Sequence, residues 1–297
     1  MDQHRHHDHD DSKNISTAFF LNLVFTVIEI AGGLLTNSVA ILSDAIHDLG
    51  DSITLGISWG MEKVSKRKGT PRLTFGYRRY SLLGALISSL VLLLGSAYIL
   101  IRAVGRIRDP EAVNTTGMLI IAVVGVLING AAVLRLRGGH KLNQRVVMLH
   151  LLEDVLGWIA VLLVSIVLQF YDLPILDPIL SICITVFVLF KIYPNIKQTL
   201  KIFLQYSPDD IDVQTLKKAL RGLDKVTDVH DVHLWSIDGS YNIFSCHLKI
   251  DRDLTLSQIE RVKNIAKEML HNFGIEHATL EFEFAGTECV QCEFEEE

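Results

Sequence analysis

Long apolar stretches alternate with short polar ones over the first two thirds of the chain. A helix that crosses a bilayer needs about 20 predominantly apolar residues, and residues 81–101 supply such a stretch without one charged side chain. Five further stretches are expected to be spans, although one of them is interrupted by a single glutamate and two contain several histidines or acidic residues. The expected spans are residues 17–35, 38–61, 81–101, 112–134, 146–171 and 178–190. The pattern therefore predicts an α-helical membrane domain with six transmembrane helices, over residues 15–204.

After residue 204 the pattern becomes that of a water-exposed α+β domain. Apolar residues first recur at helical spacing and then at every second position, which is typical of strands. The expected elements are a helix over 207–223, strands over 226–237 and 241–250, a helix over 257–273 and a strand over 278–284. This αββαβ order predicts a small ferredoxin-like domain over residues 205–297. Residues 1–14 form a polar, histidine-rich tail.

The basic residues of the short loops predict the orientation. Lys and Arg gather in the segments 62–80 and 135–145, whereas the other connections hold few of them or offset them with acidic residues. Because short cytoplasmic loops carry an excess of Lys and Arg, both segments, both termini and the C-terminal domain are expected to be cytoplasmic. The short chain, without a long histidine-rich loop, favours a bacterial cytoplasmic membrane.

Composition and charge remove several classes of protein. The chain has 297 residues, 49% of them hydrophobic, and a net charge of −6. Residues 205–297 alone hold nine basic and 19 acidic side chains, a balance that speaks against nucleic acid as a partner. Four cysteines in a chain of this length exclude a disulfide framework. The polar N-terminus excludes a cleavable signal peptide.

Two identical polar motifs interrupt the second and fifth predicted spans. His47 and Asp51 are four residues apart, as are His150 and Asp154, so each pair lies on one helix face. Ionisable residues inside a bilayer are costly and indicate function. Two imidazoles and two carboxylates suit tetrahedral Zn²⁺ better than Mg²⁺ or Ca²⁺. We expect zinc and protons to compete for this site, because protonated ligands release metal.

A purely structural interpretation competes with the metal site. Each histidine could be a buried hydrogen-bonding residue and each aspartate could pair with a basic residue of a neighbouring span, but no basic residue lies near the middle of any predicted span. Other polar residues in the spans are interpreted as pore-lining or helix-contact groups rather than ligands, and Glu29 is allowed to face an aqueous cavity. These residues are Asn22, Glu29, Asp44, Asp48, Glu153 and Asp177.

The segments 43–51 and 150–154, together with Val229-His230-Asp231-Val232-His233-Leu234-Trp235-Ser236, resemble the cation diffusion facilitator transporters, and most closely their zinc branch. The similarity covers nearly the whole chain. It implies a homodimeric transporter, not an enzyme, that exports Zn²⁺ from the cytoplasm in exchange for H⁺ by alternating access. Several family members of broader specificity have a carboxylate in place of the first histidine ligand of the second span. His47 occupies this position here and favours zinc, while cadmium and cobalt remain alternative substrates.

The resemblance also implies a cytosolic metal site in the C-terminal domain. The family's positions match His230 and His247 on two strands and Glu283 on the last strand, with Glu281 as the alternative if that strand is shifted by two residues. His233 is expected to share the face of His230. A solvent-exposed strand histidine without a ligand is the competing interpretation for each position.

Cys289 and Cys292 form a CxxC motif near the C-terminus, which supplies half of a tetrahedral zinc site. The motif resembles a cysteine pair in some animal-type zinc transporters, where a histidine-containing N-terminal segment completes the site. The corresponding residues here are His4, His6, His7 and His9. A redox pair and a disordered metal-collecting tail are the alternatives. Cys183 and Cys246 are expected to be buried packing residues.

Two further functions compete with transport. An intramembrane metalloprotease would need a motif such as HExxH, and the sequence contains none. A membrane metal sensor would use the same ligands without moving the ion. Binding of zinc without flux into vesicles would distinguish the sensor from the exporter.

Overall fold

The computed structural model describes residues 4–65, 69–136, 142–251 and 253–286. The chain divides into two compact units. Unit 1 contains residues 1–68 and 83–196, and unit 2 contains residues 69–82 and 197–297. Each is described separately.

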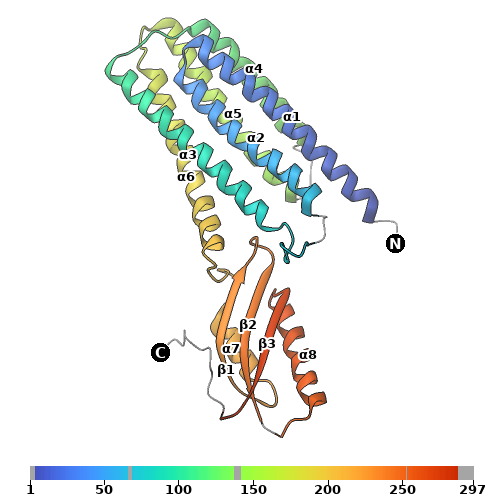
Figure 1. Ribbon diagram of the computed structural model, residues 1–297. Helices are drawn as coiled ribbons and strands as arrows, with labels where there is room; N and C mark the ends of the chain where they lie inside the picture. The colour runs from blue at the N-terminus through green and yellow to red at the C-terminus, as the bar shows by residue number, and fades with distance from the viewer. Residues whose placement is uncertain (1–3, 66–68, 137–141, 252, 287–297) are drawn as a thin grey trace. The chain divides into compact units, whose positions relative to one another are not determined.

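Six long helices lie side by side as a bundle in unit 1 (Figure 1). They are α1 (His4–Thr36), α2 (Val39–Ser65), α3 (Arg79–Arg108), α4 (Thr115–Leu136), α5 (Leu142–Phe170) and α6 (Leu176–Phe203). Over the described residues, α3, α6 and most of α4 and α5 are long and apolar enough to cross a membrane, which makes four candidate spans. α1 contributes a shorter apolar section, and α2 is interrupted by acidic residues and histidine.

Two helices extend well beyond their predicted bounds. α1 already begins at His4, within the expected polar tail, because residues 4–16 contain neither proline nor glycine to end a helix. α6 continues past residue 190 to Phe203 and includes Pro194. A proline is tolerated in a membrane helix when neighbouring groups satisfy the backbone. The extension of α6 also brings Lys191, one residue beyond the predicted end of the sixth span, inside the helix.

Small residues let the helices of unit 1 approach closely. A methyl group added at Gly125 of α4 would lie 2.2 Å from the ring of Trp158 on α5, so only glycine allows this contact. Trp158 is fully buried, and Phe25 of α1 meets it edge-on with ring centroids 6.0 Å apart. The indole therefore joins α1, α4 and α5 through van der Waals packing, the main attraction between helices in a membrane.

Unit 2 contains the predicted αββαβ order. Its elements are α7 (Val213–Arg221), β1 (Val226–Ser236), β2 (Asn242–Ile250), α8 (Leu256–Asn272) and β3 (His277–Phe284). The strand order is β1-β2-β3; β1 and β2 are antiparallel, whereas β2 and β3 are parallel. A parallel pair needs a crossover connection, and α8 provides it.

The helices of unit 2 cover one face of the sheet and leave the other to polar side chains. Alternate β2 residues Phe244, Cys246 and Leu248 are buried against both helices. The apolar helix residues in this core are Leu216, Leu220, Val262, Ala266 and Leu270. His247 and its β2 neighbours two residues away therefore point to the opposite face.

Local signals define the helix ends of unit 2. The Asp212 carboxylate accepts hydrogen bonds from the Gln214 and Thr215 amides and begins α7. The Thr215 hydroxyl also donates to it, and these hydrogen bonds, the hydroxyl's first, lower the pKa of Asp212. After α8, Gly274 adopts a φ of 79°, a conformation that glycine enters without strain.

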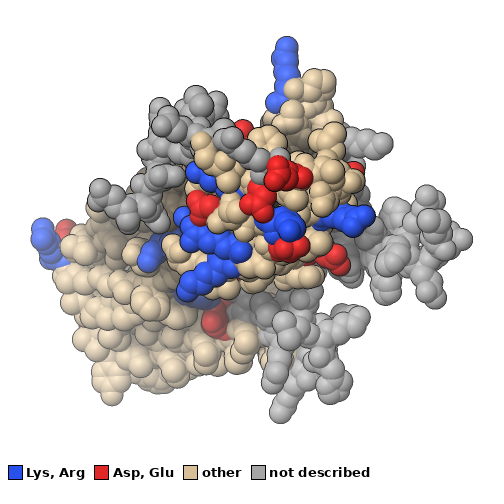
Figure 2. Space-filling view, turned by 90° about the horizontal axis from the view of Figure 1, so that it is seen from below, with Lys and Arg blue, Asp and Glu red and all other residues tan. Residues whose placement is uncertain are grey.

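Charged side chains of both signs are mixed on the surface. Lys and Arg lie directly beside Asp and Glu on the face seen in Figure 2. Ion pairs account for part of this mixture, including Arg221 with Asp228 at 2.9 Å and Lys201 with Asp209 at 2.7 Å. Pairs this exposed contribute about 0–1 kcal/mol each to stability.

Candidate metal sites

His47 and Asp51 lie together on α2, as their spacing predicts. The His47 Nε2 and Asp51 Oδ2 atoms are 3.8 Å apart, and the side chains are 16% and 27% exposed. Two potential ligands from adjacent turns thus sit in a partly accessible place within a helix of the membrane domain. Both groups can bind a divalent metal once His47 is neutral and Asp51 is ionised.

α5 contacts α2 close to the second motif. A methyl group added at Gly157 would lie 3.6 Å from Asp44 Oδ1, so the two helices approach within one turn of Asp154. Asp154 is partly buried. His150 lies one turn earlier on α5, and its side chain is outside the described part of the structure. The two motifs therefore lie on adjoining helices.

Glu153 has a basic partner that the sequence did not suggest. Lys191 Nζ donates a hydrogen bond to its carboxylate and joins α5 to α6. Of the two roles expected for Glu153, pore lining and helix contact, the structure supports the helix contact. This ion pair was not expected from the sequence, because Lys191 lies one residue beyond the predicted end of the sixth span.

Three other carboxyl groups are buried at the interface of α1 and α2. Glu29 is 0% exposed, Asp44 6% and Asp48 7%. Other polar groups along this interface are hydrogen-bonded: Asn22 donates to the Asp48 carbonyl oxygen and to Ser52 Oγ, both at 3.0 Å. The expectation that Glu29 faces an aqueous cavity is wrong, because its side chain is fully buried.

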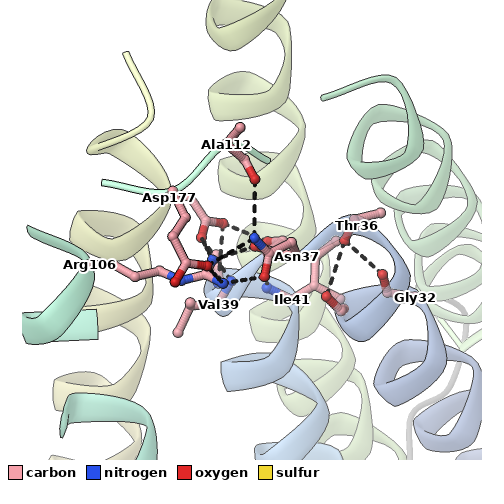
Figure 3. Close-up of polar contacts among 12 residues, drawn as sticks. Gly32, Thr36, Asn37, Val39, Ile41, Arg106, Ala112 and Asp177 are labelled. Carbon is pink, nitrogen blue, oxygen red and sulfur yellow. Dashed lines mark hydrogen bonds and ion pairs between the residues drawn. The ribbon is translucent and has the colours of Figure 1, made fainter. Parts of the chain in front are cut away.

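A second polar cluster joins the ends of several helices of unit 1 (Figure 3). Arg106, at the end of α3, donates hydrogen bonds to the backbone and side-chain oxygens of Asn37 and to Glu111. Hydrogen bonds from Asn37 and the nearby Arg106 charge lower the pKa of Glu111. Arg106 Nη1 also lies 3.9 Å from Asp177 Oδ2.

Asp177 caps the beginning of α2. Its carboxylate accepts hydrogen bonds from the Ser38 hydroxyl at 2.5 Å, the Val39 amide at 2.8 Å and the Ala40 amide at 3.3 Å. These amides would otherwise lack partners at a helix N-terminus, where a negative charge is also favoured. The first turn of α6 thus fixes the helix that carries His47.

The cytosolic candidates His230, His247 and Glu283 come together on the free face of the sheet. One ligand atom from each lies within 4.8 Å of the others. Glu283 Oε1 is 2.9 Å from His247 Nδ1, and Glu283 Oε2 is 3.2 Å from His230 Nε2. Both histidines are buried. Two imidazoles and a carboxylate at these distances fit a zinc ion with a further ligand.

Sequence reasoning missed Asp231 in this cluster. Its Oδ2 lies 3.4 Å from His247 Nε2, and its Oδ1 lies 3.0 Å from His233 Nε2. Asp231 has a φ of 48° in a β-bulge, which shifts the register so that His230 pairs with His247 and His233 with Ser245. The bulge places His230 and His233 on one face, as predicted. The sequence His230-Asp231-Val232-His233, with a carboxylate between two histidines, could have suggested Asp231 as a member of the cluster.

The alternative ligand Glu281 is also within reach. Its Oε2 lies 3.5 Å from His247 Nε2, but its side chain is 64% exposed, against 14% for Glu283.

Cys289, Cys292 and the side chains of the N-terminal histidines are outside the described residues. Cys246 is fully buried, and burial raises the pKa of its thiol to about 12. This agrees with the buried packing role expected for Cys246, since the thiolate is the reactive form. Cys183 of α6 is exposed, so the expectation that it is buried is wrong.

Comparison with known proteins places the whole chain in one family. The model described as "Cation efflux transmembrane domain" matches residues 15–204, and that described as "Cation efflux protein, cytoplasmic domain" matches residues 208–284. A "Cadmium, cobalt and zinc/H(+)-K(+) antiporter" of Bacillus subtilis is 34% identical over 284 residues, covering 94% of this chain and 91% of the relative.

Two further relatives span almost the same length. A "Zinc transporter ZitB" of Pectobacterium atrosepticum is 32% identical and covers 99% of this chain and 92% of its own length. A "Metal cation efflux system protein CzcD" of Cupriavidus metallidurans is 29% identical, covering 95% of this chain and 90% of the relative. The chain therefore belongs to the cation diffusion facilitator family of divalent metal cation efflux transporters, in its zinc, cadmium and cobalt branch.

Proposed function

We propose that the protein exports Zn²⁺ in exchange for H⁺ by alternating access, through a tetrahedral site of His47, Asp51, His150 and Asp154. The observation that carries the proposal is the contact of α5 with α2 beside Asp154, since it puts two identical motifs on adjoining membrane helices. The names of the relatives support zinc as a transported ion and an antiport mechanism.

The chemistry of the site accounts for exchange. Neutral imidazole and ionised carboxylate groups hold the metal, and the two carboxylate charges offset its double positive charge in a medium of low dielectric constant. Protonation of the same ligands weakens zinc binding. A proton gradient can therefore empty the site on one side of the membrane and allow it to fill on the other.

The same proposal includes a complete domain arrangement. Residues 1–14 form a cytoplasmic tail, residues 15–204 a transport domain of six membrane helices, and residues 205–297 a ferredoxin-like cytoplasmic domain. Both termini face the cytoplasm of a bacterium, as the basic segments 62–80 and 135–145 indicate. The two less apolar helices, α1 and α2, complete the bundle because their polar groups meet one another rather than lipid.

Regulation by cytosolic metal and dimer formation is proposed for the C-terminal domain. His230, His247 and Glu283 bind a regulatory zinc ion, and the domain joins two subunits. Support comes from the arrangement of the ligand atoms and from the match to the family's cytoplasmic domain model. A separate contribution of Cys289 and Cys292, together with the N-terminal histidines, stays a prediction.

One alternative concerns the range of metals. The Bacillus subtilis relative is named for cadmium and cobalt as well as zinc, and a site with two imidazoles can accept all three, since affinity order alone does not determine selectivity. Competition of Cd²⁺ and Co²⁺ with zinc uptake into proteoliposomes tests the breadth of the site. A sensor without transport predicts bound zinc and no uptake in the same vesicles.

A further inference from the structure

The buried face of α6 changes from polar to apolar along the helix. Asp177, Ser181 and Thr185 follow one another at intervals of four residues, so their side chains share one face. Ser181 is 0% exposed and Thr185 2%. The next turns of the same face carry Val188 and Ile192, which are buried with a leucine of α3. The first part of this face can therefore form hydrogen bonds, whereas the later part cannot.

The polar part of this face contacts α2. Thr185 Oγ1 lies 2.7 Å from Ser43 Oγ and donates a hydrogen bond to the Ser181 carbonyl oxygen at 2.8 Å. A hydroxyl has only one proton to donate, so Ser43 is the donor to Thr185. At the beginning of the same interface, Asp177 accepts a hydrogen bond from the Ser38 hydroxyl (Figure 3). Polar contacts thus join α6 to α2 from its first turn to Thr185.

The proposed zinc ligands of α2 are directed toward this interface. α2 faces α6 at Ser43, and it faces α5 at Asp44, whose Oδ1 would lie 3.6 Å from a methyl group added at Gly157. At about 100° per residue, His47 and Asp51 are turned about 40° and about 80° from Ser43, between these two directions. The site is therefore bordered by α6 as well as by α5. Ser43 is one turn from His47, toward the beginning of α2.

The hydroxyl of Ser181 lies between the two contacts with α2. Its Oγ atom is buried and has no hydrogen-bond partner among the residues that the structure describes, which is unfavourable. By contrast, Ser165 of α5 is equally buried and donates to the Leu162 carbonyl oxygen at 2.8 Å. A hydroxyl that served only to join helices would have such a partner. Ser181 is instead able to bind a polar species that passes between α2 and α6.

We propose that zinc leaves the site of His47 and Asp51 between α2 and α6, past Thr185 and Ser181, toward the end of the bundle at which α6 begins. The inference rests on the proposed transport function and orientation, in which that end faces away from the cytoplasm. Hydroxyl groups hydrogen-bond to the waters of a hydrated ion, and the apolar face from Val188 onward blocks the opposite direction. The Ser43–Thr185 contact closes this route in the structure, and its separation opens the route.

The test is the labelling of cysteines placed on this face of the full-length protein. Zinc-loaded spheroplasts of a bacterial host receive a positively charged, membrane-impermeant methanethiosulfonate from outside, and peptide mass spectrometry distinguishes each position from the native cysteines. Ser181→Cys should be modified, and faster during zinc export than without zinc. Val188→Cys, on the apolar part of the face, and Ser165→Cys, on α5, should stay unmodified. An unmodified Ser181→Cys, or equal modification of Ser165→Cys, would overturn the proposal.

Zinc flux into proteoliposomes provides the second measurement. Thr185→Val replaces the hydroxyl with a methyl group and should slow flux about 3- to 10-fold, with an unchanged affinity for zinc because no ligand is lost. Thr185→Ser keeps the hydroxyl and should retain most of the flux, and Ser165→Ala should retain all of it. Equal flux in Thr185→Val and the wild type would contradict the proposal. A wild type without zinc flux would instead refute the transport function, which separates the two failures.

Discussion

The acidic residues of the membrane helices differ in the donors that surround them. Asp177 receives three hydrogen bonds and Glu153 pairs with Lys191, whereas neither carboxyl oxygen of the buried Glu29 has a hydrogen-bond partner among the described residues. Asp51 lies beside His47. Asp177 and Glu153 therefore hold helices together, while Asp51 is one of the proposed zinc ligands.

Loss of the Asp51 carboxylate should remove zinc binding at the transport site. Asp51→Ala deletes one of two ligand charges without removing core volume, so the free energy of unfolding should change by no more than about 1 kcal/mol. Calorimetry of the detergent-solubilised protein should show one fewer zinc site per subunit. The exposed Asp109→Ala serves as the control. Undiminished zinc binding in Asp51→Ala would contradict the ligand assignment.

The N-cap carboxylate of α7 should contribute to acid stability. The pKa of Asp212 is lowered in the folded protein, so its stabilisation is complete above the unfolded pKa of about 3.9 and is lost as the pH falls through the folded value. Asp212→Asn keeps an oxygen acceptor but loses the charge.

Thermal unfolding of both proteins between neutral and acidic pH provides the measurement. The wild type should have the higher Tm near neutrality, and the difference should shrink with acidification below the unfolded pKa. A difference in Tm that stays constant down to the lowest pH would show that the charge of Asp212 has no part in the stability of α7.

At the scale of elements, α2 is held at its first turn by residues distant in sequence. Asp177 of α6 caps it, and Arg106 of α3 binds the Asn37 oxygens immediately before it. Because acidic residues and a histidine interrupt the apolar sequence of α2, these polar contacts contribute to its anchoring. They determine where His47 and Asp51 lie within the bundle.

Removal of the Asp177 carboxylate should therefore be costly. Asp177→Ala leaves the first amides of α2 without acceptors and Arg106 with one fewer counter-charge, and breaking such a buried pair typically costs about 3–5 kcal/mol. The measurement is the Tm of the purified protein in detergent. Asp177→Asn retains one side-chain oxygen and should lose less. Equal Tm values for Asp177→Ala and the wild type would contradict the anchoring role.

Two glycines that follow helices of unit 2 should respond oppositely to alanine. Gly274 has a φ of 79°, so Gly274→Ala should lose about 1–2 kcal/mol from left-handed strain. Gly222 has a φ of −77°, and Gly222→Ala should be neutral or slightly stabilising. Denaturant unfolding of the two variants distinguishes these outcomes, and equal losses would show that backbone conformation is not the cause.

The elements of unit 2 were predictable because local signals agree there. Alternation predicted the strands, and α8 begins after Thr255 close to its predicted start, but α7 begins at Val213 rather than at residue 207, because Asp212 caps it. The β-bulge at Asp231 was not predicted, since it depends on pairing with β2. The extension of α6 was also missed because hydropathy falls at Lys191 although the helix continues to pack.

At the scale of the whole molecule, the chain combines a membrane domain with a cytoplasmic domain that carries its own cluster of ligands. Motif spacing identified the transport candidates from sequence, since residues four apart share a helix face. The contact between α2 and α5 and the different partners of the buried carboxylates were not predictable, because both depend on tertiary packing. The family match covers both domains.

Zinc should strengthen association of the subunits through the cytosolic cluster. His247 contacts Glu283, Asp231 and Glu281, so His247→Ala removes the central imidazole. Sedimentation of the full-length protein in detergent should show a zinc-dependent increase in dimer that is lost in His247→Ala and preserved in His271→Ala, an exposed histidine of α8. An undiminished zinc effect in His247→Ala would contradict a role of the cluster in dimer formation.

The most direct test of the antiport claim is zinc uptake into proteoliposomes with an acidic interior, compared with vesicles without a pH gradient and with vesicles containing Asp154→Ala. The account predicts uptake that the gradient accelerates, accompanied by alkalinisation of the vesicle interior, and background uptake in the variant. Uptake independent of the gradient, or equal uptake in Asp154→Ala, would contradict a zinc/proton antiporter that uses the α2–α5 site.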